Sequence, residues 1–284
     1  MQGMIVGGDA RSRHLAQLLH RDGMDVVHAL QTQPQLDWQQ LCQMDFVVLP
    51  ANFLGGVVRG EAGQISGIEI ARHLKHGAQL YCGCADAAMH EQCKRGEVRL
   101  IEMLHDPIFV YQNALLTAEA AVMRAIQLTC GTLYQSHCVI IGAGRIAQGL
   151  LSLLRPFTPH LTLVARSTLA REQAEWQGVQ AVPLIQLPAV LQTADFIFNT
   201  VPARIMPTWM KEPMQPGTIY MELASPPYGM DPDAASDHIV YALEAGLPGK
   251  ISPLAAARAM QRVLVHTWEE TQCKTSEANE LDLP

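Results

Sequence analysis

The chain has 284 residues, of which 49% are hydrophobic, and it carries a formal net charge of −7. This length predicts two domains of ordinary size, each able to bury its own core. The charge is spread along the chain without a run of Lys and Arg, which argues against a nucleic-acid partner. No apolar stretch approaches the roughly 20 residues of a membrane-spanning helix, so no membrane association is expected.

We expect a cytoplasmic protein, because the N-terminus lacks a basic region followed by a long apolar one. The seven cysteines are odd in number and irregularly spaced, which favours a reducing compartment over a disulfide framework. Cys82, Cys84, His90 and Cys93 are zinc-ligand types, but a C-x-C followed by H-x-x-C is not a strong zinc spacing. We predict no metal site and interpret these cysteines through burial at the end of a strand, 79–82.

The first 113 residues alternate short apolar runs with segments of helical periodicity, which is typical of an α/β domain with a parallel sheet. Helices are expected to begin near Ala10, Ile65 and Asp86. The expected strands are Met4–Val6, Val26–Ala29, Phe46–Leu49, Leu80–Cys82 and Val98–Ile101. We predict that residues 1–113 form a substrate-binding and catalytic domain.

A segment with helical spacing, Thr117–Thr129, is interpreted as a helix that joins two domains. We predict a Rossmann cofactor-binding domain over 114–270, which ends in a long helix at about Pro253–Glu269, and a flexible acidic tail over 271–284. The fold class is therefore two Rossmann-like, doubly wound parallel-sheet domains with an interdomain cleft. The expected strands of the second domain are Cys138–Ile141, Leu161–Val164, Phe196–Phe198, Ile219–Met221 and Ile239–Ala242.

A G-x-G-x-x-A turn follows the first strand of the second domain, at Gly142, Gly144 and Ala147. Gly142 permits the tight turn, Gly144 lets the backbone approach a pyrophosphate, and Ala147 lets the helix lie close to the strand. The helix then starts with Arg145 and Ile146, and its N-terminal N–H groups can bind phosphate oxygens. This turn predicts a dinucleotide cofactor.

The second strand of this domain ends at Arg166, Ser167 and Thr168, where an NAD site would present an acid to the ribose 2′-hydroxyl. A guanidinium with two hydroxyls suits a 2′-phosphate, so we predict NADP. The alternative is that Arg166 is a surface cation or packs over the adenine. Asn199, Thr200 and Ser225 follow two further strands and are candidates for contacts near the nicotinamide, or else ordinary strand-ending residues.

The first strand of the chain ends in a second glycine turn, Gly7-Gly8-Asp9-Ala10-Arg11. Asp9 can cap the following helix, and Arg11 can be directed at an anion. Other motifs accompany the two turns: Leu49-Pro50, Asn113, Thr117-Ala118-Glu119, Leu223-Ala224-Ser225, and Gly246-Leu247-Pro248-Gly249 with Pro253.

With Gly142–Arg145, Ala165–Ser167 and Asn199–Pro202, these motifs resemble the A-subunit family of dipicolinate synthase over nearly the whole chain. That family makes pyridine-2,6-dicarboxylate in bacterial spore formation. The resemblance implies a two-domain protein related to 2-hydroxyacid dehydrogenases, with cofactor and substrate between the domains. It also implies NADP-dependent oxidation of dihydrodipicolinate, formed from 4-hydroxy-tetrahydrodipicolinate, and a partner, the flavoprotein-like B subunit; a homo-oligomer stays open.

A dicarboxylate substrate needs at least two cationic contacts. Arg11, beside Gly8, is the leading candidate for one carboxylate, and Arg204 or Lys250 could bind the other, although both could be plain surface residues. For the base we would test Asp9 and Glu119, and Glu119 could instead cap the joining helix.

Three positions depart from the family pattern. Pro226 stands where an Arg or Lys is common, Glu222 where Asp is usual, and Ala120 where Gly is usual. The missing cation leaves open a different NADP(H) oxidoreductase acting on a small carboxylate, although the Arg, Glu and His set of 2-hydroxyacid dehydrogenases cannot be assembled from the expected loops. A non-catalytic protein that binds the cofactor and holds another subunit is the third alternative.

Overall fold

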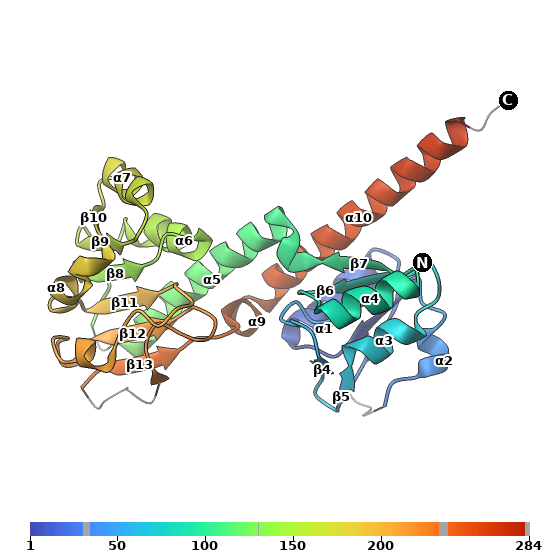
Figure 1. The fold of residues 1–284 in the computed structure, drawn as a ribbon, viewed down its shortest axis with the longest axis horizontal. Coiled ribbons are helices and arrows are strands. Elements are labelled where there is room, and N and C mark those ends of the chain that lie inside the picture. The colour runs from blue at the N-terminus through green and yellow to red at the C-terminus, as the bar shows by residue number, and fades with distance from the viewer. Residues whose placement is uncertain (31–34, 130, 233–237, 282–284) are drawn as a thin grey trace. The chain divides into compact units, whose positions relative to one another are not determined.

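The computed structural model describes residues 1–30, 35–129, 131–232 and 238–281, without the side chains of 208, 211 and 271–281. The chain divides into two compact units: unit 1 is Met1–Asn113 with Pro248–Pro284, and unit 2 is Ala114–Leu247 (Figure 1). Each unit has a parallel sheet with helices wound around it, which confirms the predicted α/β fold class. Among the described helices, none combines the length and apolar composition needed to cross a bilayer.

The main sheet of unit 1 has five parallel strands in the order β2-β1-β3-β6-β7. Met4 and Val6 of β1 belong to the core that contains Ile70 of α3 (Gly67–His73), whereas Ile5 belongs to the core on the other face. Because successive side chains of a strand point to opposite faces, these apolar strands bury both faces of the sheet. The strands are β1 (Gln2–Val6), β2 (Asp25–Ala29), β3 (Phe46–Val48), β6 (Gln79–Cys82) and β7 (Arg99–Glu102).

Helices α1 (Ala10–Arg21) and α10 (Pro253–Leu281) pack together over one face of this sheet. Met260 and Leu264 of α10 share a core with Leu15 of α1. Residues 248–270 therefore belong to unit 1, and not to the second domain as the sequence analysis expected, because the long helix buries its apolar face on the first sheet.

Helix α10 continues to Leu281, through most of the segment 271–284 for which the sequence analysis expected a flexible acidic tail. The flexibility of that tail stays a prediction. Residues 282–284 of that tail lie outside the described residues.

Unit 2 has six parallel strands in the order β10-β9-β8-β11-β12-β13, which is the strand order of a Rossmann fold. Five of them match the expected strands, and the edge strand β10 was not anticipated. The strands are β8 (Cys138–Ile141), β9 (Leu161–Val164), β10 (Gln180–Val182), β11 (Phe196–Asn199), β12 (Ile219–Glu222) and β13 (Val240–Leu243). The helices between them are α6 (Arg145–Leu154), α7 (Thr168–Trp176) and α8 (Leu187–Leu191), with 3-10 turns η2 (Leu184–Gln186) and η3 (Thr208–Lys211).

The joining helix α5 (Pro107–Leu128) begins ten residues before the expected Thr117. Asp106 Oδ1 accepts a hydrogen bond from the Phe109 N–H at 2.6 Å, and Pro107 follows the cap, so the helix starts with an acidic cap and a proline in its first turn. The chain returns to unit 1 within α9 (Leu247–Ile251). Unit 1 also contains α2 (Trp38–Leu41), α4 (Ala87–Arg95), the 3-10 turn η1 (Met103–His105), and an antiparallel hairpin of β4 (Val57–Arg59) and β5 (Gln64–Ser66).

The packing of α10 on the sheet of unit 1 predicts that the same substitution lowers the free energy of unfolding by different amounts at two leucines of this helix. Leu264 is fully buried and Leu254 is 40% exposed. Leu264→Ala should lower the free energy of unfolding by about 2–5 kcal/mol, because it leaves a cavity against the sheet. Leu254→Ala is the control and should cost less than about 1 kcal/mol. Urea unfolding followed by circular dichroism measures both, and equal costs would contradict the packing.

Candidate functional site

The glycine turn of unit 2 has the geometry that a dinucleotide phosphate requires. Gly142 has a φ of +109°, and a Cβ there would lie 2.3 Å from Thr200 Oγ1, so a larger residue does not fit. A Cβ on Gly144 would have no heavy atom within 4 Å. Gly144 caps α6, and no side chain occupies the N–H groups that follow. The turn is therefore tight at its first glycine and open at its second, which fits a pyrophosphate at the N-terminus of α6.

A cavity of about 250 Å³ lies beside this turn at the carboxyl ends of β8 and β9. It brings Gly142, Arg166 and Ser167 together, as the sequence analysis expected, and Leu184 and Ile205 add apolar surface. Arg145 is exposed and Ile146 half-buried in the first turn of α6. The cavity has the composition of an adenosine site, with apolar walls and a polar rim.

The backbone at Ala165 and Arg166 is held by a second arginine, Arg171, that the sequence analysis did not single out. Arg171 Nη1 donates to the Ala165 carbonyl at 2.7 Å and to the Arg166 carbonyl at 2.9 Å. Ser167 Oγ accepts the Ala170 N–H at 3.2 Å and caps α7. Arg166 is exposed, and among the described residues no carboxylate pairs with it. Its guanidinium is thus available to an anionic ligand.

The three residues expected near the nicotinamide have different surroundings. Asn199 is fully buried, and its Nδ2 donates to Glu222 Oε1 at 2.6 Å. Thr200 Oγ1 donates to the Ile141 carbonyl at 2.9 Å, and Ser225 is exposed after β12. Asn199 is therefore buried in a hydrogen bond to Glu222, whereas Ser225 has the exposure that a ligand contact needs. The contacts expected near the nicotinamide stay predictions.

Glu222 is a buried carboxyl group surrounded by hydrogen-bond donors. Its Oε1 also accepts the Ala224 N–H at 3.1 Å, and its Oε2 accepts the Gly229 N–H at 2.8 Å and the Tyr220 hydroxyl at 3.2 Å. Burial raises the pKa of Glu222, although the hydrogen bonds from Gly229 and Asn199 act in the opposite direction. These bonds connect the end of β11 to the segment after β12.

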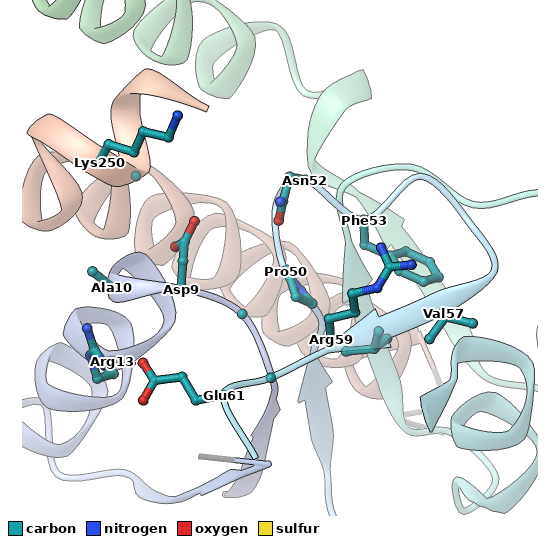
Figure 2. Close-up of a pocket in the computed structure, with 14 residues that line it drawn as sticks. Asp9, Ala10, Arg13, Pro50, Asn52, Phe53, Val57, Arg59, Glu61 and Lys250 are labelled. Carbon is teal, nitrogen blue, oxygen red and sulfur yellow. Dashed lines mark hydrogen bonds and ion pairs between the residues drawn. The ribbon is translucent and has the colours of Figure 1, made fainter. Parts of the chain in front are cut away.

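A larger cavity, of about 680 Å³, lies at the carboxyl edge of the unit 1 sheet (Figure 2). It is lined by the segments that follow β1 and β3, by the β4–β5 hairpin, and by α9. Since β1 lies between β2 and β3, the winding of the sheet reverses at this point, which is where open α/β sheets bind ligands. The predicted residues Gly8, Asp9 and Lys250 all line this cavity.

Gly7 and Gly8 allow the hairpin to approach β1. Gly7 has a φ of +66°, and a Cβ there would lie 2.5 Å from the Arg59 carbonyl oxygen. The Gly8 N–H donates to the same oxygen at 2.7 Å. The N–H of Gly8 is therefore used to hold the hairpin and is not available to a ligand. What Gly8 gives the cavity is space, because it has no side chain.

Three cationic side chains surround this cavity, and the sequence analysis named only Lys250. Arg13 forms an ion pair with Glu61, whereas Arg59 and Lys250 are exposed and have no carboxylate partner among the described residues. Figure 2 shows that Lys250 comes from the α9 side and Arg59 from the hairpin. The sequence analysis expected no strand at β4, which is only three residues long. The position of Arg59 beside the cavity could therefore not be predicted from the sequence.

Arg11 lies elsewhere than expected. Its Nε donates to Asp9 Oδ1 at 2.9 Å and its Nη2 to Asp9 Oδ2 at 2.7 Å, and the residue is only 6% exposed. A Cβ on Gly249 would lie 2.6 Å from Asp9 Oδ2 and 2.8 Å from Arg11 Nε, so α9 fits closely over this ion pair. Arg11 is thus the buried partner of Asp9 and lines no described cavity.

The ion pair changes the acidity of Asp9. Partial burial raises its pKa, but the hydrogen bonds and positive charge of Arg11 prevail and hold the pKa below its ordinary value of 3.8. Asp9 is therefore a carboxylate at neutral pH, and its side chain is 43% exposed.

Two other predicted residues belong to unit 2. Glu119 is exposed in the middle of α5 and does not cap it, because that helix begins at Pro107. Arg204 is exposed, with its Nη1 3.4 Å from Asp231 Oδ2.

A six-stranded Rossmann sheet with this glycine turn is also the architecture of nicotinamide-dependent dehydrogenases. Residues 109–206 match the family described as D-isomer specific 2-hydroxyacid dehydrogenase, NAD binding domain. The fold is also similar to D-lactate dehydrogenase from Escherichia coli, with a TM-score of 0.61 at 16% identity over 96% of this chain and 97% of that one. The family match supports an oxidoreductase with a nicotinamide cofactor, and the similarity to the solved structure supports the fold.

Similarity to one particular protein extends over nearly the whole chain. The chain is 26% identical to the A subunit of dipicolinate synthase from Bacillus subtilis, over 95% of this chain and 96% of that protein. The crystal structure of the A subunit of dipicolinate synthase from Bacillus halodurans has the same fold, with a TM-score of 0.82 at 22% identity over 94% of this chain and 97% of that one. The resemblance inferred from the motifs is thus confirmed.

The lowered pKa of Asp9 predicts how stability depends on pH. The ion pair stabilises the folded state above 3.8, and this contribution is lost as the pH falls through the lower folded-state pKa. Asp9→Asn should lower the Tm at about pH 7, because it leaves Arg11 buried without its partner, and the difference from the unmodified protein should narrow below about pH 4. The exposed Asp25 gives a matched control, Asp25→Asn. Thermal unfolding across this range measures the effect, and a difference that stays constant would contradict it.

Proposed function

We propose that the protein is the A subunit of a dipicolinate synthase, an NADP-dependent oxidoreductase that oxidises dihydrodipicolinate to dipicolinate. The observation that supports this most is the unit 1 cavity at the reversal of the sheet, where Arg59 and Lys250 are available to carboxylates. The likeness of the whole chain to the A subunit of dipicolinate synthase agrees with it. The proposal includes a partner, the B subunit, and action in the cytoplasm during spore formation.

The substrate would be held by its two carboxylates. A planar dicarboxylate leaving water needs a donor group at each end. We assign one carboxylate to Arg59 and the other to Lys250, with the exposed Asn52 of the same cavity as a further donor. Arg11 then contributes indirectly, because it holds the Asp9 carboxylate in place. Arg204 stays a candidate for binding a substrate carboxylate and should be tested by substitution.

The oxidation removes one hydride and one proton from the dihydropyridine ring and leaves the aromatic dicarboxylate. Bound NADP⁺ supplies the acceptor for the hydride. Asp9 is our candidate for the proton acceptor, because it is ionised and lines the cavity, and because aromatisation provides a driving force that makes a weak base sufficient. Glu119 is the second carboxylate to test. The reaction also requires the ring and the nicotinamide to meet, so positioning should contribute more to the rate than any single base.

A 2-hydroxyacid dehydrogenase is the second candidate, because the matched family of residues 109–206 is of that type. Such an enzyme needs an acid–base group at the hydroxyl, and among the described residues no histidine lines the unit 1 cavity. A panel of hydroxy and imino acids tests it. A cofactor-binding protein without activity would bind NADP and give no turnover with any substrate or partner.

The cofactor preference gives a paired test. Arg166→Ala should raise the KM for NADP by about 10- to 100-fold, the cost of losing charge-assisted hydrogen bonds to a phosphate, and leave the KM for NAD unchanged. Arg145→Ala is the matched control, because Arg145 lies at the helix terminus near the pyrophosphate and should affect both cofactors alike. Steady-state kinetics with each cofactor measure the effect. A better kcat/KM with NAD in the unmodified protein would contradict the NADP assignment.

The reaction is tested by supplying the condensation product of aspartate semialdehyde and pyruvate to the purified chain, with and without the B subunit. The ultraviolet absorbance of dipicolinate should appear together with an equal amount of NADPH. Arg59→Ala and Lys250→Ala should each raise the KM for the substrate by at least about tenfold, because each removes a charged contact. Lys94→Ala, an exposed lysine at the end of α4, should not. Absence of dipicolinate with both proteins present would disprove the proposal.

A further inference from the structure

A cluster of metal-ligating side chains lies at the carboxyl ends of β6 and β7. The ligand atoms of Cys84, Glu102 and His105 all lie within 4.8 Å of one another. His105 Nδ1 is 3.2 Å from Glu102 Oε2, and His90 Nε2 of α4 is 3.3 Å from the same oxygen. None of these four residues lines the unit 1 cavity, and the proposed oxidation uses none of them.

The backbone around the cluster holds the carboxylate in place. Glu102 Oε1 accepts the Ala85 N–H at 2.7 Å, which leaves Oε2 for the two imidazoles. The Leu104 N–H donates to the Gly83 carbonyl at 2.9 Å and ties the segment after β7 to the segment after β6. A Cβ on Gly83 would lie 2.3 Å from the Ala51 carbonyl oxygen, so this close approach requires glycine.

The sequence analysis considered a different set of ligand types, Cys82, Cys84, His90 and Cys93, and predicted no metal site. Cys82 and Cys93, two of the four residues considered there, are 0% and 2% exposed in the apolar core. The fold instead brings Cys84 close to Glu102 and His105, which come from a separate strand and the turn after it. His90 reaches this group through Glu102, with its Nε2 3.3 Å from Glu102 Oε2. The Glu102 side chain is 10% exposed, and those of His90 and His105 are 52% and 67% exposed, so the carboxylate is fixed while the imidazoles can adjust.

We propose that Cys84, His90, Glu102 and His105 bind Zn²⁺. Thiolate, imidazole and carboxylate are its usual protein ligands, and bonds of about 2.0–2.3 Å in a tetrahedron place ligand atoms about 3.3–3.8 Å apart. The two distances to Glu102 Oε2 are already close to this range. Binding forms four ligand bonds, and the Cys84 thiol releases its proton to solvent. Four protein ligands leave no open position, so the site is structural and ties the segment after β6, helix α4 and the segment after β7 together.

The proposal is tested with the full chain, free of any histidine tag and stripped of metal by a chelator. Co²⁺, a spectroscopic substitute for Zn²⁺, should bind in a one-to-one ratio and give the near-ultraviolet thiolate band and the intense visible bands of tetrahedral cobalt. Zn²⁺ should displace it and raise the Tm.

Cys84→Ser should abolish the thiolate band. His105→Gln should weaken Zn²⁺ binding by at least about tenfold, because loss of a direct ligand should cost no less than loss of a group that only supports a ligand. The controls are Cys42→Ser, an exposed cysteine outside the cluster, and His76→Gln, an exposed histidine that pairs with Glu97. Both should behave like the unmodified protein. Far-ultraviolet circular dichroism verifies that each variant is folded, and the solvent-exposed His105 makes misfolding of His105→Gln unexpected. No stoichiometric binding, or the same band and affinity in Cys84→Ser and His105→Gln, would overturn the site.

Discussion

The reversal of winding in each parallel sheet is the constraint on which both cavities depend. In unit 1 the chain proceeds from β1 to β2 on one side and then crosses to β3 on the other, and in unit 2 β8 lies in the same way between β9 and β11. Helices that follow neighbouring strands then cover opposite faces, which leaves a space at the carboxyl ends of the strands. A glycine turn borders each space, at Gly7 in unit 1 and at Gly142 in unit 2. Glycine is required at both positions because another segment lies too close for a Cβ.

The Asp9–Arg11 ion pair shows that the fold, and not the local sequence, decides which cationic side chains face the unit 1 cavity. The sequence places Arg11 two residues after a helix cap and suggests that it faces a ligand. In the structure the same spacing lets the guanidinium fold back on the capping carboxylate, and Gly249 brings α9 over the pair. The positive charge toward a ligand then comes from Arg59 and Lys250, which lie 191 positions apart in the sequence by the difference of their numbers, 250 − 59. Only the tertiary fold brings them to one cavity.

Local patterns predicted most of the two sheets, because strands buried on both faces are continuous apolar runs that turn residues interrupt. The edge strand β10 and the hairpin strand β4 each have only three residues, which is too short for a periodic signal. The place of α10 could not be predicted for another reason. Its apolar face is visible in the sequence, but which sheet it covers is a long-range property, and Met260 and Leu264 pack on the first sheet. The predicted dinucleotide turn, by contrast, is a local motif, and Gly142 and Arg166, which local patterns singled out, line one cavity.

Glu222, at a position where the resemblance implies Asp, is a buried carboxyl group that joins several segments of unit 2. The carboxylate must meet donors from three segments: Asn199 at the end of β11, the Ala224 N–H after β12, and the Gly229 N–H further along the chain. A Cβ on Gly229 would lie 2.4 Å from Asn199 Nδ2, so this segment lies directly against the strand end. With these three donors and the Tyr220 hydroxyl, the buried carboxyl group is satisfied in spite of its desolvation. The network joins the end of β11 to the segment after β12 and so holds that segment in place, while Ser225 within it stays exposed.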